Sequence, residues 1–173
     1  MSENNTAFID GANLHKSIEN LEWYFDYAKF RVWLREKFNV QCAYMFLGKI
    51  SKYKERYETL QAEGFNLFFK DVIFNSRGQA KGNCDADLIV HVMQEAYENK
   101  FDKAILVTSD GDFAPLIKFL MIQDKLDIVL SPYPVNKCSL LIKRTNAKIA
   151  YITDQQSILE AKNEKAPDGD ETP

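Results

Sequence analysis

The sequence contains few residues of the kinds that build disulfide frameworks or zinc sites. Its three cysteines, Cys42, Cys84 and Cys138, are far apart and include no C-x-x-C pair. Its two histidines, His15 and His91, do not stand near a cysteine or a second histidine at ligand spacing. An odd number of scattered cysteines argues against a disulfide scaffold and a zinc site, and fits a reduced cytosolic protein.

Long apolar runs and a surplus of positive charge are also absent. No stretch approaches the roughly 20 apolar residues that a membrane span needs, and residues 1–5 are polar. We therefore expect a cytoplasmic protein, or in a eukaryote a nuclear one, without a membrane partner. The net charge of −3 gives no global positive field, so any nucleic-acid contact would have to come from a local basic groove.

The chain of 173 residues has the size of one domain, with 46% hydrophobic and 27% charged residues. We expect that domain to span residues 6–161, after a flexible N-terminus at residues 1–5. Residues 162–173 are charged, contain two prolines and lack bulky apolar side chains, so they are predicted to be a disordered tail.

Short apolar runs alternate with helical patterns along the domain. Strands are predicted at residues 6–9, 41–47, 66–70, 103–108, 126–130 and 148–152. Helices are predicted at residues 26–38, 52–63, 85–99, 113–123 and 137–144. Strands separated by helices indicate an α/β fold of three layers, with a mainly parallel central sheet flanked by helices on both faces.

Two of the predicted strands end in an aspartate followed by glycine. Asp10 follows the run at residues 7–9, and Asp110 and Asp112 follow the run at residues 104–107. The carboxyl ends of parallel strands meet at one edge of a sheet, where open α/β folds keep their ligand sites. Asp10 could instead be only a helix-capping residue, and Asp112 is also well placed as the N-cap of the next helix, whereas Asp110 is not required as a cap.

A further acidic group opens the helical pattern at residue 85. Asp85 shares a helix face with Leu88 and Val92, which is predicted to pack inward, so its carboxylate would be costly without a cation or donors. Asp87 falls with His91 on the opposite, polar face and is predicted to be a solvated first-turn acid. Clustered carboxylates repel one another unless a cation lies between them, so the pattern favours a divalent metal and metal-assisted phosphoryl chemistry.

Substrate contacts are expected from polar residues near these acids. Asn13 could cap the turn after Asp10 or hydrogen-bond across it. Arg77 and Lys81 lie in the polar segment 75–83, which is predicted to be a flexible loop that contacts substrate or simply lies in solvent. Lysines and arginines interleaved with tyrosines at residues 49–57 would extend the same basic track, or form an ordinary solvated helix face.

Three ordered segments, residues 8–13, 81–88 and 106–113, resemble the NYN family, in its LabA-like branch of the PIN-domain nucleases. The resemblance covers most of the domain. It implies a Rossmann-like PIN fold whose acidic cluster binds Mg²⁺ or Mn²⁺ and cleaves RNA. By position, the implied cluster consists of Asp10, Asp85, Asp110 and Asp112, with Asn13 and Ser109 beside it.

One position departs from the family pattern. Many relatives carry another aspartate six residues after the one that matches Asp85, and this chain has His91 there. The alternative to a ribonuclease is therefore a catalytically weak or inactive RNA-binding or regulatory module of the same fold. Other metal phosphotransfer enzymes fit less well, because the haloacid-dehalogenase pattern expects Asp-x-Asp where this chain has Asp10-Gly11-Ala12.

A homodimer is one candidate assembly, because an interface could form from the aromatic residues Trp23, Tyr24, Phe25 and Tyr27. Large apolar patches are uncommon on soluble monomers, so we expect these side chains to fold back over the sheet instead.

Overall fold

A six-stranded sheet forms the centre of the molecule. The computed structural model describes residues 3–49, 53–81 and 84–162. Every neighbouring pair in this sheet is parallel, and the strand order is β3-β2-β1-β6-β7-β8. The strands are β1 (Asn5–Asp10), β2 (Val40–Lys49), β3 (Asn66–Asp71), β6 (Ala104–Val107), β7 (Leu126–Ser131) and β8 (Ile149–Tyr151). All six predicted strands are found, each within a few residues of its expected bounds.

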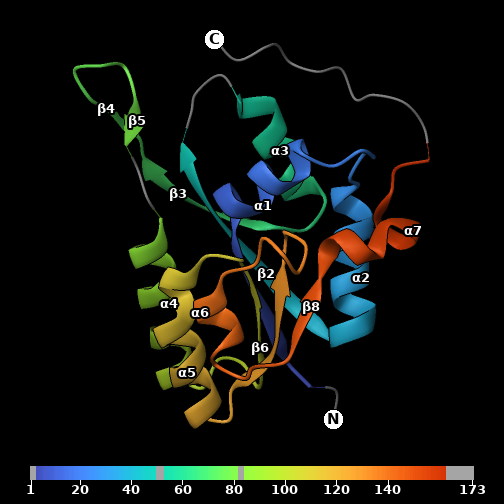
Figure 1. Ribbon diagram of the computed structural model, residues 1–173, viewed down its shortest axis with the longest axis vertical. Helices are drawn as coiled ribbons and strands as arrows, with labels where there is room; N and C mark the ends of the chain where they lie inside the picture. Colours follow the sequence, from blue (N-terminus) through green and yellow to red (C-terminus); the bar gives the residue numbers. More distant parts are fainter. Residues whose placement is uncertain (1–2, 50–52, 82–83, 163–173) are drawn as a thin grey trace.

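Helices cover both faces of this sheet, which confirms the three-layer α/β architecture (Figure 1). One core joins the sheet to α1 (Gly11–Glu19), α2 (Tyr27–Phe38), α3 (Lys54–Ala62) and α7 (Gln156–Leu159). A second core joins the other face to α4 (Asp85–Tyr97), α5 (Ala114–Ile122) and α6 (Leu140–Lys143). β1 and β6 are buried along their whole length because they lie in the middle of the sheet.

Several segments differ from the sequence-based expectation. The helix α1 was not expected as a separate element, because it presents few apolar side chains and begins directly after β1. The short helix α7 was not expected either. The segment predicted as a loop is framed by a short antiparallel hairpin, β4 (Ile73–Phe74) with β5 (Ala80–Lys81), which projects from the body (Figure 1). The last predicted helix is shorter than expected, because α6 begins at Leu140 after its N-cap, Ser139.

The aromatic segment before α2 folds onto the molecule, as expected. Trp23, Phe25 and Tyr27 pack against the core on the α2 face, and only Tyr24, at 53% exposed, remains largely in solvent. The homodimer stays a prediction.

The two terminal segments predicted to flank the domain are described only in part. Residues 1–2 of the predicted flexible N-terminus and residues 163–173 of the predicted tail lie outside the described residues. The sheet begins at Asn5, within the predicted N-terminal segment. Among the described residues, no helix combines the length and the hydropathy that crossing a membrane would require.

Candidate metal centre

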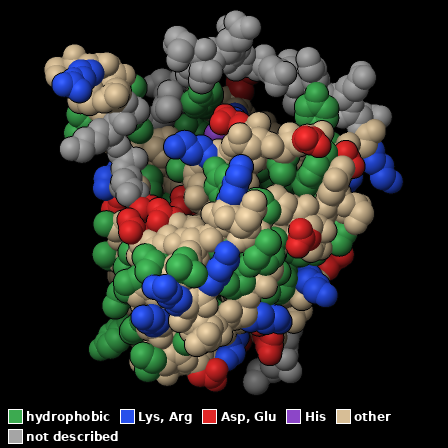
Figure 2. All heavy atoms as spheres, in the orientation of Figure 1, with side chains coloured by type: hydrophobic (Ala, Val, Ile, Leu, Met, Phe, Trp, Pro, Cys, Tyr) green, Lys and Arg blue, Asp and Glu red, His purple; other side chains and the backbone are tan. Residues whose placement is uncertain are grey.

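Two neighbouring strands and one helix bring the acidic residues to one edge of the sheet. β1 and β6 pair in parallel with Ile9 opposite Val107, so the turns that follow them emerge side by side. Asp10 ends β1, Asp110 follows β6, and Asp85 is the first residue of α4. Figure 2 shows acidic side chains gathered where α4 begins, below the projecting hairpin.

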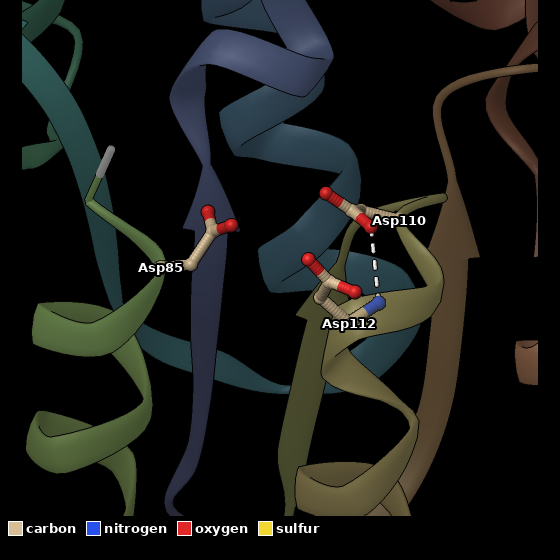
Figure 3. Close-up of side chains that lie close together, drawn as sticks. All are labelled: Asp85, Asp110 and Asp112. Carbon is tan, nitrogen blue, oxygen red and sulfur yellow. Dashed lines mark hydrogen bonds between the residues drawn. The ribbon is translucent and has the colours of Figure 1, made fainter. Parts of the chain in front are cut away.

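Asp85, Asp110 and Asp112 form the tightest group. Each offers one carboxylate oxygen, and these three oxygens lie within 4.8 Å of one another. Figure 3 shows Asp85 reaching from α4 toward the two aspartates that follow β6. Asp85 and Asp110 are half-buried and Asp112 is exposed, so the group faces solvent on one side.

Asp10 lies deeper than this group, and its side chain is only 7% exposed. Its Oδ1 accepts a hydrogen bond from the Asn13 backbone N–H at 3.1 Å, and its Oδ2 accepts one from the Thr108 hydroxyl at 3.1 Å. Burial raises the pKa of Asp10 to about 6, and the charges of Asp85 and Asp110 contribute to the rise, while the two hydrogen bonds oppose it. A cation placed among these carboxylates would favour ionised Asp10 and remove the repulsion.

Two polar side chains tie the turn after β1 to the turn after β6. The Asn13 Oδ1 accepts hydrogen bonds from the backbone N–H of Ser109 at 2.9 Å and from its hydroxyl at 2.7 Å. The fully buried Thr108 hydroxyl donates to Asp10 and accepts from the Asp110 backbone N–H at 3.1 Å. These bonds hold Asp10 and Asp110 at a fixed spacing, which is what a metal site requires of its ligands.

Thr108 was missed by the sequence reasoning. It stands at the end of an apolar strand, directly before Ser109 and Asp110. A hydroxyl at a position predicted to be buried needs partners, and that need was the available signal.

The helix caps at this edge are assigned differently from the expectation. Asp110, not Asp112, is the capping residue. It caps the short 3-10 helix Gly111–Phe113, because its Oδ1 accepts a hydrogen bond from the Asp112 backbone N–H at 3.0 Å. The helix α5 begins later, at Ala114, and its N-cap, Phe113, makes no side-chain cap hydrogen bond. Asp10 does cap α1, so its capping and its place in the acidic cluster are compatible.

The glycines after Asp10 and Asp110 are required by close packing. A Cβ at Gly11 would lie 2.6 Å from the carbonyl oxygen of Phe46 and 2.3 Å from Leu47 Cδ2. A Cβ at Gly111 would lie 2.4 Å from the Ser139 hydroxyl. All three distances are far below van der Waals contact, so each Asp-Gly pair lets the chain pass directly beside a neighbouring segment.

The basic residues predicted to contact substrate lie on the hairpin. Arg77 is exposed in the turn between β4 and β5, and its backbone N–H donates to Asn75 Oδ1 at 3.0 Å. Lys81 belongs to β5, but the position of its side chain lies outside the described structure. Asp87 is not simply solvated, because the ammonium group of Lys70 on β3 lies 3.1 Å from its carboxylate.

His91 does not lie on a polar face, which corrects the prediction. Its imidazole packs among the rings of Phe8, Tyr44, Phe46 and Phe68, at centroid distances from 4.6 to 6.2 Å. Burial lowers the pKa of His91. The three clustered carboxylates therefore come together without a contribution from this position.

The basic track predicted at residues 49–57 is described only in part, because residues 50–52 lie outside the described chain. Lys54 pairs with Glu58 at 3.8 Å on the surface of α3. Both ring nitrogens of His15 lie within 3.0 Å of the Arg56 guanidinium group. The His15–Arg56 contact joins α1 to α3. Lys54 and Arg56, two basic residues of the predicted track, thus have partners within the protein.

The donor set at this edge is chemically suited to a hard divalent cation. Mg²⁺ and Mn²⁺ prefer carboxylate oxygen ligands and usually keep water or substrate phosphate oxygens in their remaining positions. Three carboxylates that share one small space, with a buried fourth behind them whose pKa is raised, fit that preference. Exposure of the group on one side leaves access for a phosphate.

The chain is similar to a known protein family and to a solved structure. The family model described as NYN domain matches residues 6–151. A crystal structure of a protein of unknown function from Vibrio parahaemolyticus is similar, with a TM-score of 0.72 and 22% sequence identity, over 87% of this chain and 93% of that chain. At this level of sequence identity, the similarity shows only that the two proteins share a fold. No curated protein matches the sequence.

Proposed function

The chain belongs to the NYN domain family, and from that premise we propose that it is a Mg²⁺- or Mn²⁺-dependent ribonuclease. NYN domains have a PIN-like nuclease fold and are generally nuclease-like hydrolases that act on nucleic acid. PIN-like nucleases typically use divalent metals. RNA as the substrate and the LabA-like branch are part of the proposal, and both come from the sequence resemblance.

The observation that carries the proposal is the meeting of Asp85, Asp110 and Asp112 within 4.8 Å at the solvent-facing edge of the sheet. These three carboxylates would hold the cation, and Asp10 would add negative charge from behind them. A divalent cation in such a site activates water and stabilises negative charge on a phosphate.

The remaining residues would position these groups and the substrate. Thr108 and the Asn13–Ser109 pair hold the two aspartate-bearing turns in register. The exposed Arg77 on the hairpin would contact the RNA backbone, and Lys81 would do the same from β5. A histidine base is not required in this scheme, because a divalent cation held by these carboxylates would supply the activation of water.

The test is cleavage of labelled single-stranded and structured RNAs in Mg²⁺, in Mn²⁺ and in EDTA. Wild type and Asp10→Asn would be purified in parallel with Asp124→Asn as the matched control. Asp124 is an exposed aspartate with a backbone φ of 53°, which asparagine tolerates well, so this variant removes one charge far from the acidic edge. We expect metal-dependent cutting by wild type and by Asp124→Asn only.

Two outcomes would contradict the proposal. Cutting by Asp10→Asn at the wild-type rate would show that the activity is a contaminant or that the site lies elsewhere. RNA retained on a filter without cutting by any of the three proteins would favour the RNA-binding or regulatory module, and the His91 position would then be the first place to examine.

A further inference from the structure

A pocket of about 160 Å³ adjoins the acidic edge, between β3 and the start of α4. Its walls combine aromatic and polar groups: Phe46, Phe68 and His91, together with Lys70, Cys84 and Asp87. Cys84 directly precedes Asp85, so the pocket and the carboxylate cluster share a boundary. A group bound in this pocket would therefore lie next to a phosphate held at the cluster.

One ring in the pocket is presented to solvent and held firmly. Phe68 is 38% exposed although it stacks on Phe46, with ring centroids 5.0 Å apart and planes 11° from parallel. Tyr44 contacts the same ring edge-on at 5.4 Å, and His91 lies 4.6 Å away. A ring fixed in this way keeps an aromatic surface exposed at little further cost in conformational entropy, as base-stacking sites do.

The polar side of the pocket carries one donor and one acceptor. The Lys70 Nζ lies 3.1 Å from Asp87 Oδ2, and both side chains remain about half exposed. An ammonium group can donate to ring carbonyl oxygens, and a carboxylate can accept from ring N–H and amino groups. Purine and pyrimidine bases combine such an edge with flat aromatic faces.

We propose that this pocket binds one unpaired RNA base, stacked on Phe68, from a nucleotide next to the phosphate held at the carboxylates. The inference rests on the proposed function and narrows its substrate to single-stranded RNA. Drug-sized ligands occupy pockets of roughly 300–1,000 Å³, so a pocket of about 160 Å³ suits one base. A base inside a duplex is stacked on both faces and paired along its edge, so it cannot enter.

The experiment measures binding of a short single-stranded RNA to Asp110→Asn in Mg²⁺, so that the RNA stays intact. A series of oligonucleotides carries one abasic site, placed at each position in turn. We expect removal of one particular base to weaken binding about 5- to 100-fold, the range for stacking of one base on an aromatic side chain. Removal of the other bases should have much smaller effects.

Phe68→Leu in the same background should weaken binding of the intact RNA by a similar factor. It should also abolish the difference between the intact RNA and the sensitive abasic one, because ring and base act as a pair. Tyr24→Leu removes an exposed aromatic ring from the α2 side of the sheet and should leave the whole pattern unchanged. If Phe68→Leu fails to fold, Phe68→Trp keeps an aromatic surface and should preserve the sensitive position.

The outcomes separate this inference from the proposed function. In one outcome wild type cuts RNA, but removal of any base weakens binding equally, or Phe68→Leu leaves the effect of base removal unchanged. That outcome would overturn the proposed pocket and leave the proposed ribonuclease standing. A single sensitive position that depends on Phe68, in a protein that never cuts RNA, would support the pocket and overturn the ribonuclease. Absence of binding to any of the oligonucleotides would overturn the pocket.

Discussion

The two Asp-Gly turns at the acidic edge have the same local sequence and differ in depth. Asp10-Gly11 and Asp110-Gly111 both follow buried, neighbouring parallel strands, and both aspartates cap the helical turn that comes next. Asp10 is 7% exposed and both of its oxygens accept hydrogen bonds, whereas Asp110 is half-buried and lies in the carboxylate group that faces solvent. Identical dipeptides thus occupy different environments, and under the proposed function Asp110 would meet the cation while Asp10 would add negative charge from behind it.

Residue type and spacing alone therefore do not specify the electrostatics of a carboxylate. Burial is the largest cause of the rise in the pKa of Asp10 to about 6, and the neighbouring charges of Asp85 and Asp110 add to it. In the absence of metal, Asp10 therefore carries a cost in stability that a cation would remove. The following experiments test the contrast between the two turns, from the largest expected effect to the smallest.

Asp110→Asn should lower kcat/KM for RNA at least about 100-fold, because loss of groups that merely orient metal ligands already costs about 10- to 100-fold. Its unfolding free energy in EDTA should stay close to that of wild type, since the introduced asparagine side chain keeps an oxygen that can cap the next turn. Steady-state cleavage and denaturant unfolding measure the two quantities. A folded variant that cuts RNA at the wild-type rate would remove Asp110 from the site.

Asp10→Asn should make the metal-free protein more stable at neutral pH, by up to about 3 kcal/mol. The folded pKa of Asp10 is about 6 and its ordinary value is 3.8, so the folded wild type holds this proton more tightly than the unfolded chain does. Wild-type stability therefore falls as the pH rises from about 4 to about 6, and the variant escapes that loss.

Urea unfolding in EDTA at a series of pH values measures this effect. The gain in unfolding free energy of Asp10→Asn over wild type should be absent near pH 4 and complete above pH 6. Saturating Mg²⁺ should reduce or reverse it, because a ligand that binds the folded protein stabilises the wild type. A difference that does not change between pH 4 and pH 7 would show that Asp10 has an ordinary pKa.

Gly11→Ala should cost about 1–3 kcal/mol of unfolding free energy, the usual range for overpacking. Gly111→Ala should cost less. The new Cβ at residue 11 meets a backbone carbonyl oxygen of β2, which cannot move alone, whereas the one at residue 111 meets the Ser139 hydroxyl, which can rotate away. Thermal unfolding of both variants gives the comparison, and equal costs would mean that the backbone of β2 adjusts freely.

Thr108→Val should lower the unfolding free energy by about 1–2 kcal/mol, because it removes the hydroxyl that hydrogen-bonds to both turns. It should also raise the pKa of Asp10 further, since the bond from Thr108 lowers that pKa. The pH dependence of stability in EDTA reports the shift as a movement of its midpoint to higher pH. Thr59→Val, at a helix-surface hydroxyl that bonds only within α3, is the matched control and should leave the midpoint in place.

The strands and the sheet edge that carries the acids were predictable from the sequence. Runs such as residues 104–107 are short, continuously apolar and followed by turn residues, a pattern that only a buried parallel strand satisfies well when helical patterns separate such runs. Asp10 and Asp110 were predicted to share one edge because parallel strands end on the same side, and Asp85 was added from its place at the start of a helix and from the family resemblance. That prediction depends on local patterns and on chain direction.

Which groups touch was decided by the tertiary structure. His91 was placed on a polar face by helical periodicity, but four rings from β1, β2 and β3 surround it, and their positions depend on strand order. The pairing of Lys70 with Asp87 and the bond between Thr108 and Asp10 likewise join residues far apart in the chain. Most of the helices, the strands of the central sheet and the edge where the acids meet could be read from the sequence, because they follow from local patterns and chain direction. Burial, charge coupling and the aromatic pocket could not be read in this way, because they depend on packing between segments distant in the chain.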